Sequence, residues 1–151
     1  LDALILDVKF GRAAFMQTKA NARKLAKAMV ALGHECGVDT RAILTDMNTP
    51  LGRAAGNWLE VKESVASLEG KGPADLLEIV IDSAAHLLVQ TRKAKSLATA
   101  RKLAEDCLNS GAPRAKWDEM IVAQGADLKA FSRKLALDST AGIVAQIRAF
   151  P

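Results

Sequence analysis

The fold is decided by the run Ala3-Leu4-Ile5-Leu6-Asp7-Val8-Lys9-Phe10, which is almost continuously apolar. Such a run is typical of a strand that is buried on both faces, as in parallel sheets. Thr18 is a suitable N-cap for the following helix, whose apolar residues recur at helical spacing until Gly33 or Gly37 would end it. A second β-like run covers 41–45. Strand, helix and strand in this order predict a βαβ unit with parallel strands and a right-handed crossover.

The pattern becomes helical beyond the second strand. We expect helices over about 57–69, from Pro73 onward, from Ser96 to Gly111, and over about 113–124 and 127–137. A final strand is expected over about 141–150. Strand-like runs close to both ends of the sequence favour a segment of a longer protein, because domains usually end in polar residues. The fold class is therefore α/β, a parallel βαβ unit followed by a helical segment.

Composition excludes several classes of protein. The chain has 151 residues, of which half are apolar and a quarter charged, so it can form a core and is not wholly disordered. A net charge of +4 and six aromatic residues are too little to indicate a nucleic-acid partner. The apolar stretches fall short of the roughly 20 residues that a membrane-spanning helix needs.

The cysteines and histidines carry no recognisable site. Two cysteines, Cys36 and Cys107, make neither a disulfide framework nor a zinc site, so we expect small buried side chains and a cytoplasmic location. His34 and His86 have no acid or cysteine at catalytic spacing and are expected to be satisfied or exposed. Trp58 and Trp117 are expected in the core.

Two loops are candidate sites, since ligands bind beyond the carboxyl ends of strands in open parallel sheets. In the first loop, 9–15, Lys9 could meet an anionic or carbonyl oxygen and Phe15 could form a wall for a flat heterocycle. The alternative is that Lys9 caps the sheet edge and Phe15 packs beneath the loop. A dinucleotide site is excluded, because Gly11 is the only glycine where three are needed.

The second loop, 46–57, precedes a helix with two glutamates. Gly52 and Gly56 are spaced by four residues, and Glu60 and Glu63 follow. Backbone carbonyls with one carboxylate could hold a hard cation, which takes oxygen ligands. The alternative is a tight helix entry, with both glutamates solvated or stabilising the helix N-terminus.

Two longer strings resemble a known family. The first is Asp7-Val8-Lys9-Phe10-Gly11-Arg12-Ala13-Ala14-Phe15-Met16, which is similar to the DVKxGxxAF segment of the thymidine and pyrimidine-nucleoside phosphorylase family. The second is Thr45-Asp46-Met47-Asn48-Thr49-Pro50-Leu51-Gly52-Arg53-Ala54-Ala55-Gly56-Asn57-Trp58-Leu59-Glu60-Val61-Lys62-Glu63, which resembles its TDMxxPLGxxxGNxLEVKE segment. Shorter matches at 70–76 and 122–126 extend the resemblance along essentially the whole chain.

The resemblance implies an enzyme that cleaves the N-glycosidic bond of a pyrimidine nucleoside with phosphate. The products would be the free base and a ribose or deoxyribose 1-phosphate. The family works as a cytoplasmic homodimer, in which a small helical domain is joined to a larger α/β domain. Residues 1–139 would form part of that α/β domain, and 140–151 would start a C-terminal strand region. Phosphate would be the co-substrate of the whole enzyme.

The resemblance also implies roles for single residues. Phe15 matches the apolar wall beside the pyrimidine ring, and Lys9 and Gly11 belong to the same substrate loop. Leu51 and Ala54 match positions whose backbone carbonyls bind potassium in some members, and Glu63 matches the carboxylate ligand.

Other parts of the family's site have no match in this sequence. The Lys-His-Ser-Thr-Gly-Gly phosphate loop and the residues that hold the base are absent, so the segment alone is expected to lack catalytic residues and activity. Gly11-Arg12-Ala13 replaces the commoner glycine-serine-glycine. Two alternatives stay open: a related phosphorylase or phosphoribosyltransferase with another base or nucleotide, and a non-catalytic binding or oligomerisation fragment.

Overall fold

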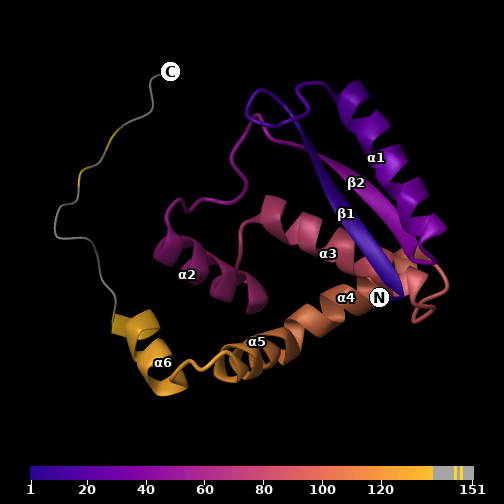
Figure 1. Cartoon of the computed structure of the whole chain (residues 1–151). Coiled ribbons are helices and arrows are strands. Elements are labelled where there is room, and N and C mark those ends of the chain that lie inside the picture. Colours follow the sequence, from indigo (N-terminus) through magenta and orange to yellow (C-terminus); the bar gives the residue numbers. More distant parts are fainter. Residues whose placement is uncertain (138–144, 146, 148–151) are drawn as a thin grey trace. The chain divides into compact units, whose positions relative to one another are not determined.

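The computed structural model describes residues 1–137, 145 and 147 (Figure 1). The chain begins with β1 (Ala3–Phe10), α1 (Lys19–Glu35) and β2 (Asp39–Asp46). The helices that follow are α2 (Asn57–Leu68), α3 (Ala74–Gln90), α4 (Leu97–Asn109), α5 (Ala112–Ala123) and α6 (Leu128–Leu137). This order confirms the α/β class. The strand expected over 141–150 and the boundary expected at 139 lie almost wholly outside the described residues and stay predictions.

The βαβ unit forms as the sequence predicts. β1 and β2 pair in parallel, with a register that runs from Ala3 opposite Asp39 to Phe10 opposite Asp46. Thr18 caps α1, because its side chain accepts the backbone N–H of Asn21 at 3.2 Å. The helix packs against both strands (Figure 1). The centre of this core is made of the following residues: Val8, Ala22 and Ala26, with Leu6, Phe10, Met16, Ala42 and Leu44 around them.

One expectation for the unit was wrong. β1 is not buried on both faces, since Val8 is its only fully buried residue. The sheet has two strands in the described part of the chain, which is too narrow for helices to cover both faces of β1 completely. Of the two glycines expected to end α1, Gly37 follows the C-cap residue Cys36 and has a φ of +76°. Gly33 lies within the helix, where a Cβ atom would come 2.1 Å from Oγ1 of the buried Thr40. Gly33 therefore lets α1 approach β2 closely.

The helices α3 and α4 form a second core. Ala85, Ala94 and Ala100 are buried there, and Ser96 caps α4 by accepting the backbone N–H of Thr99 at 3.2 Å. The guanidinium of Arg101 on α4 forms ion pairs with two carboxylates of α3. A side-chain amide of α3, Nε2 of Gln90, donates to the Asp39 carbonyl at 2.7 Å and so ties this helix to the start of β2.

Burial differs from expectation at the cysteines and tryptophans. Cys36 and Cys107 are free and exposed rather than buried, the first beyond the end of α1 and the second on α4. Trp58 and Trp117 are half-buried.

The chain divides into two compact units, residues 1–114 and a second unit that begins at Ala115. In the second unit, the rings of Trp117 and Phe131 lie 6.5 Å apart and join α5 to α6. No helix among residues 1–137 is both long and apolar enough to cross a membrane. The two candidate loops belong to the first unit.

Candidate functional site

A cavity of about 400 Å³ opens where β1 runs into the first loop. Phe15 lines it and is 93% exposed, so its ring does not pack beneath the loop. Lys9 lines the same cavity. The remaining wall is mostly apolar and includes Leu6, Val8, Ala13, Ala14, Met16, Leu25, Met29 and Met47. This arrangement suits a flat, partly apolar ring with a polar edge.

Lys9 is held by polar groups from both strands. Its Nζ atom donates to Oδ2 of Asp7 at 2.7 Å and to Oγ1 of Thr45 at 3.3 Å. The hydroxyl of Thr45 in turn donates to Asp7. The ammonium charge is therefore already paired, while the third N–H donor of the lysine remains available to a ligand in the cavity. The alternative, in which Lys9 caps the sheet edge, also agrees with some of these contacts.

Gly11 joins the first loop to the second. Its φ is +133°, and a Cβ atom there would come 3.1 Å from the backbone and side chain of Asn48. Next to it, the backbone N–H of Arg12 donates to Oδ1 of Asn48 at 3.0 Å. Gly11 is thus required by backbone conformation and by close approach.

Sequence reasoning missed Asn48. Its own backbone N–H donates to Oδ1 of Asp46 at 2.8 Å, which is an Asx turn. The string Asp46-Met47-Asn48 is a turn by composition, and that signal could have identified the residue. The backbone N–H of Met47 also donates to the Phe10 carbonyl, at 2.7 Å. The two candidate loops therefore lie side by side and are joined by hydrogen bonds.

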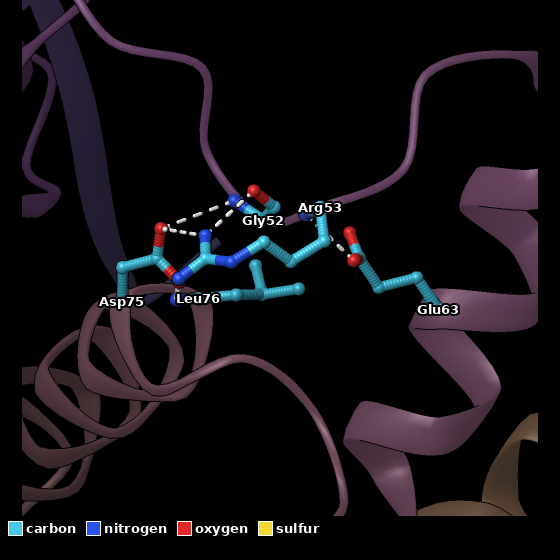
Figure 2. Close-up of polar contacts among 5 residues, drawn as sticks. All are labelled: Gly52, Arg53, Glu63, Asp75 and Leu76. Carbon is cyan, nitrogen blue, oxygen red and sulfur yellow. Dashed lines mark hydrogen bonds and ion pairs between the residues drawn. The ribbon is translucent and has the colours of Figure 1, made fainter. Parts of the chain in front are cut away.

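The second loop is held by carboxylates from two helices (Figure 2). From α2, Oε1 of Glu63 accepts the backbone N–H of Arg53 at 2.7 Å. Its other oxygen faces Gly52, where a Cβ atom would come 2.2 Å from Oε2. Glu60 accepts the backbone N–H of Gly56 at 3.0 Å. Both glutamates therefore bind loop backbone, and the hydrogen bond that Glu60 accepts from the N-cap residue Gly56 fits the alternative of a tight helix entry.

Asp75, in the first turn of α3, holds the same loop from the other side. Its Oδ2 accepts the Gly52 N–H at 3.3 Å and Nη1 of Arg53 at 3.1 Å (Figure 2). Its Oδ1 accepts the backbone N–H of Leu76 at 3.1 Å. Burial raises the pKa of Asp75, but the hydrogen bonds from Arg53, Gly52 and Leu76 and the Arg53 charge outweigh it and hold that pKa below its ordinary value.

Asp75 was not among the residues singled out from the sequence. An acidic residue two positions after Pro73 is a helix-start signal, and this signal predicts a favourable charge at the N-terminus of α3 rather than a contact with the loop. The contact depends on the path of the chain between α2 and α3, which local sequence does not encode.

The expected cation ligands lie in one short segment. Leu51 and Ala54 flank Gly52 and Arg53, and the carboxylate of Glu63 lies against that pair. In the part of the chain that the structure describes, no group of three or more His, Cys, Asp or Glu side chains could hold a metal ion. Any cation here would therefore depend on backbone carbonyls together with a single carboxylate.

The sequence matches a known family over the unit that carries both loops. The profile of the "Glycosyl transferase family, a/b domain" matches residues 1–114. This chain belongs to that family. The α/β fold and the position of both loops at the carboxyl ends of parallel strands agree with the match.

Comparison with individual proteins is more specific than the match to the family profile. This glycosyl transferase a/b domain is 47% identical over 126 residues to the pyrimidine-nucleoside phosphorylases of Staphylococcus aureus strains USA300 and NCTC 8325 / PS 47. The same protein of the bovine strain RF122 / ET3-1 is 46% identical over that length. Each match covers 83% of this chain and 29% of the relative. The resemblance to the pyrimidine-nucleoside phosphorylases is confirmed, and the chain spans less than a third of their length.

Proposed function

We propose that this chain forms the central part of a pyrimidine-nucleoside phosphorylase. The observation that carries the proposal is the cavity with Phe15 at its rim, at the carboxyl end of β1, in a chain 47% identical to proteins of that name. The reaction would transfer the pentose of a pyrimidine nucleoside to phosphate. It would release the free base and a pentose 1-phosphate.

In this proposal the first loop positions the base. The exposed ring of Phe15 offers an apolar face against which a pyrimidine can pack. The ammonium of Lys9 is oriented by its hydrogen bonds to Asp7 and Thr45. Its third N–H donor remains available to the base. Negative charge develops on a leaving base in such a reaction, and nearby positive groups stabilise it. Binding and orientation are the roles assigned to these residues, and no catalytic residue is assigned to the segment.

The proposal is tested with the 151-residue chain itself. Because the sequence lacks the Lys-His-Ser-Thr-Gly-Gly string, the isolated chain should release no uracil or thymine from uridine or thymidine in the presence of phosphate. It should still bind the free base weakly, with Phe15→Ala removing the perturbation of loop signals in an NMR titration and Phe131→Ala leaving it intact. Phosphate-dependent base release by the isolated chain would contradict this division of roles.

We also propose a potassium ion at the second loop, held by the backbone carbonyls of Leu51 and Ala54 and by Glu63. The donor set fits a hard cation, because Glu63 already lies against the 52–53 backbone between those two residues. A bound ion would supply positive charge that stabilises the loop against α2. Potassium should raise the Tm of the chain above its value in tetramethylammonium at equal ionic strength.

The matched pair of variants for the ion lies on one helix. Glu63→Ala should abolish the potassium-dependent difference in Tm, whereas Glu60→Ala, which removes only the bond to the Gly56 N–H, should preserve it. An equal potassium effect in the wild-type chain and in Glu63→Ala would exclude this site.

For the parent protein we propose a cytoplasmic homodimer. Two free, exposed cysteines in the first unit are compatible with a reducing compartment. Analytical ultracentrifugation of the whole enzyme should give twice the mass of one chain, and a monomer would contradict the proposal.

A further inference from the structure

A second cavity, of about 690 Å³, lies between α1, β2 and α3, and no function has been assigned to it above. It shares no lining residue with the cavity at the first loop. Five of its lining side chains are basic or histidine and none is a carboxylate. We name it the basic cavity, after Arg23, Lys27 and His34 of α1, Arg41 of β2 and His86 of α3.

Arg41 and His86 form its half-buried end. The Nη1 atom of Arg41 lies 3.4 Å from Nδ1 of His86. Arginine can only donate, so Nδ1 of His86 is the acceptor in this contact. The contact is long and uses one of five guanidinium N–H groups. Most of the donors of Arg41 are therefore available to a ligand.

The basic groups of the cavity are not neutralised by the chain itself. Among the described residues, no ion pair joins Arg23, Lys27 or Arg41 to a carboxylate within 4.0 Å. Arg23 and Lys27 are four residues apart on α1, where like charges are neighbours and destabilise the helix. A bound anion would remove this repulsion and supply the missing acceptors.

The charges that line the cavity favour a ligand with several negative charges. Between the basic groups the wall is formed by small and apolar side chains, namely Ala26, Val30, Ala31, Ala42 and Leu44. His34 lies eleven residues beyond Arg23, which places the two about 16 Å apart along the helix axis. Arg23 and Lys27 of α1 and Arg41 of β2 carry three positive charges, and guanidinium groups match phosphate oxygens in geometry.

We propose that the basic cavity binds a phosphate-bearing small anion, with Arg41 and Lys27 as its principal ligands. The proposal does not depend on the proposed phosphorylase activity, because it uses neither candidate loop. It assigns a second anion site to the α1–β2 surface, and a diphosphate group has the charge that the three permanent cations require.

The test is calorimetric titration of the 151-residue chain with pyrophosphate at constant ionic strength. Arg41→Gln and Lys27→Gln should each weaken binding by about tenfold or more, since each removes a charge-assisted hydrogen bond. Lys102→Gln, which removes an equally exposed cation from α4 outside the cavity, should leave the affinity unchanged. Circular dichroism of each variant confirms that it is folded.

Three outcomes would overturn the proposal. One is the absence of measurable pyrophosphate binding by the wild-type chain at millimolar concentration. Another is an equal loss of affinity in Lys27→Gln and Lys102→Gln, which would indicate only a general effect of net charge. The third is binding of an oligoglutamate peptide that is tighter than binding of pyrophosphate and sensitive to the same variants, which would assign the surface to an acidic protein partner.

Discussion

The two candidate loops lie side by side but are held by different forces. The first loop depends on backbone geometry: Gly11 has a φ of +133°, and its neighbours bond to Asn48 and to the backbone of the second loop. The second loop depends on charge: Glu63 and Asp75 reach it from α2 and α3 and accept N–H groups of Gly52 and Arg53. The Gly11 contacts are made by uncharged groups, whereas those of the second loop depend on carboxylates.

This difference separates the loop that we propose to bind the base from the loop that can respond to pH and salt. A loop fixed by main-chain conformation keeps its shape as pH and salt change, which suits the wall that Phe15 provides. A loop fixed by carboxylates changes when they are protonated or when a cation competes for them. Substitutions in the two loops should therefore differ both in size and in their dependence on pH.

The largest effect is expected for Gly11→Ala. A Cβ atom at this φ is strained and lies 3.1 Å from the backbone and side chain of Asn48, so the free energy of unfolding should fall by about 2 kcal/mol. Urea unfolding followed by circular dichroism measures it. Gly37→Ala is the control, since Gly37 also has positive φ but open space around it, and it should lose only about 1 kcal/mol. Equal losses in the two variants would show that the contact with Asn48 does not matter.

A smaller effect, with a distinct pH dependence, is expected for Asp75→Asn. Because the folded chain holds the pKa of Asp75 below its ordinary value, the carboxylate adds stability above the unfolded-state pKa of about 3.9. That stability is lost as pH falls through the lower folded-state pKa. The difference in Tm between wild type and variant should be constant from about pH 7 to 5 and should shrink below about pH 4. A difference that stays constant down to pH 3 would contradict this.

The smallest effect is expected for Arg53→Ala. Its side chain is 71% exposed, so the ion pair with Asp75 is screened and its loss should lower the Tm by about 2 °C or less. Because the backbone N–H of Arg53 still donates to Glu63 in the variant, the loop should remain protected from proteolysis. Thermal unfolding at low and high salt should show the variant converging on wild type as salt rises. A loss larger than that of Asp75→Asn would reverse the order proposed for the second loop.

The sequence predicted the secondary structure around the site better than the contacts between its elements. The run from Ala3 to Phe10 and the caps Thr18 and Ser96 encode local structure, and all three were placed correctly. The motif strings also placed both loops at the correct strand ends. Neither the contact of Asp75 with Gly52 nor the close approach of Gly33 to Thr40 was predicted. Both depend on how elements pack across the chain, which periodicity and caps do not specify.

Exposure was the other property that the sequence did not predict. Cys107 has the spacing of an inward-facing residue on its helix but is exposed, and β1 is almost continuously apolar yet largely half-buried. Apolar periodicity gives the side of an element that prefers burial, and the packed neighbours decide how much of it is covered. The same distinction explains why Phe15 could be read either as a wall or as core until its exposure was known.

The central claim is that these residues can serve as the middle of a pyrimidine-nucleoside phosphorylase. The most direct test replaces the matching 126-residue segment of the Staphylococcus aureus enzyme with the corresponding residues of this chain and measures phosphate-dependent release of uracil from uridine. The folded chimera should release uracil, and Phe15→Ala within it should lower kcat/KM by about tenfold or more. A chimera that folds and assembles but releases no base, or one in which Phe15→Ala has no effect, would contradict the account.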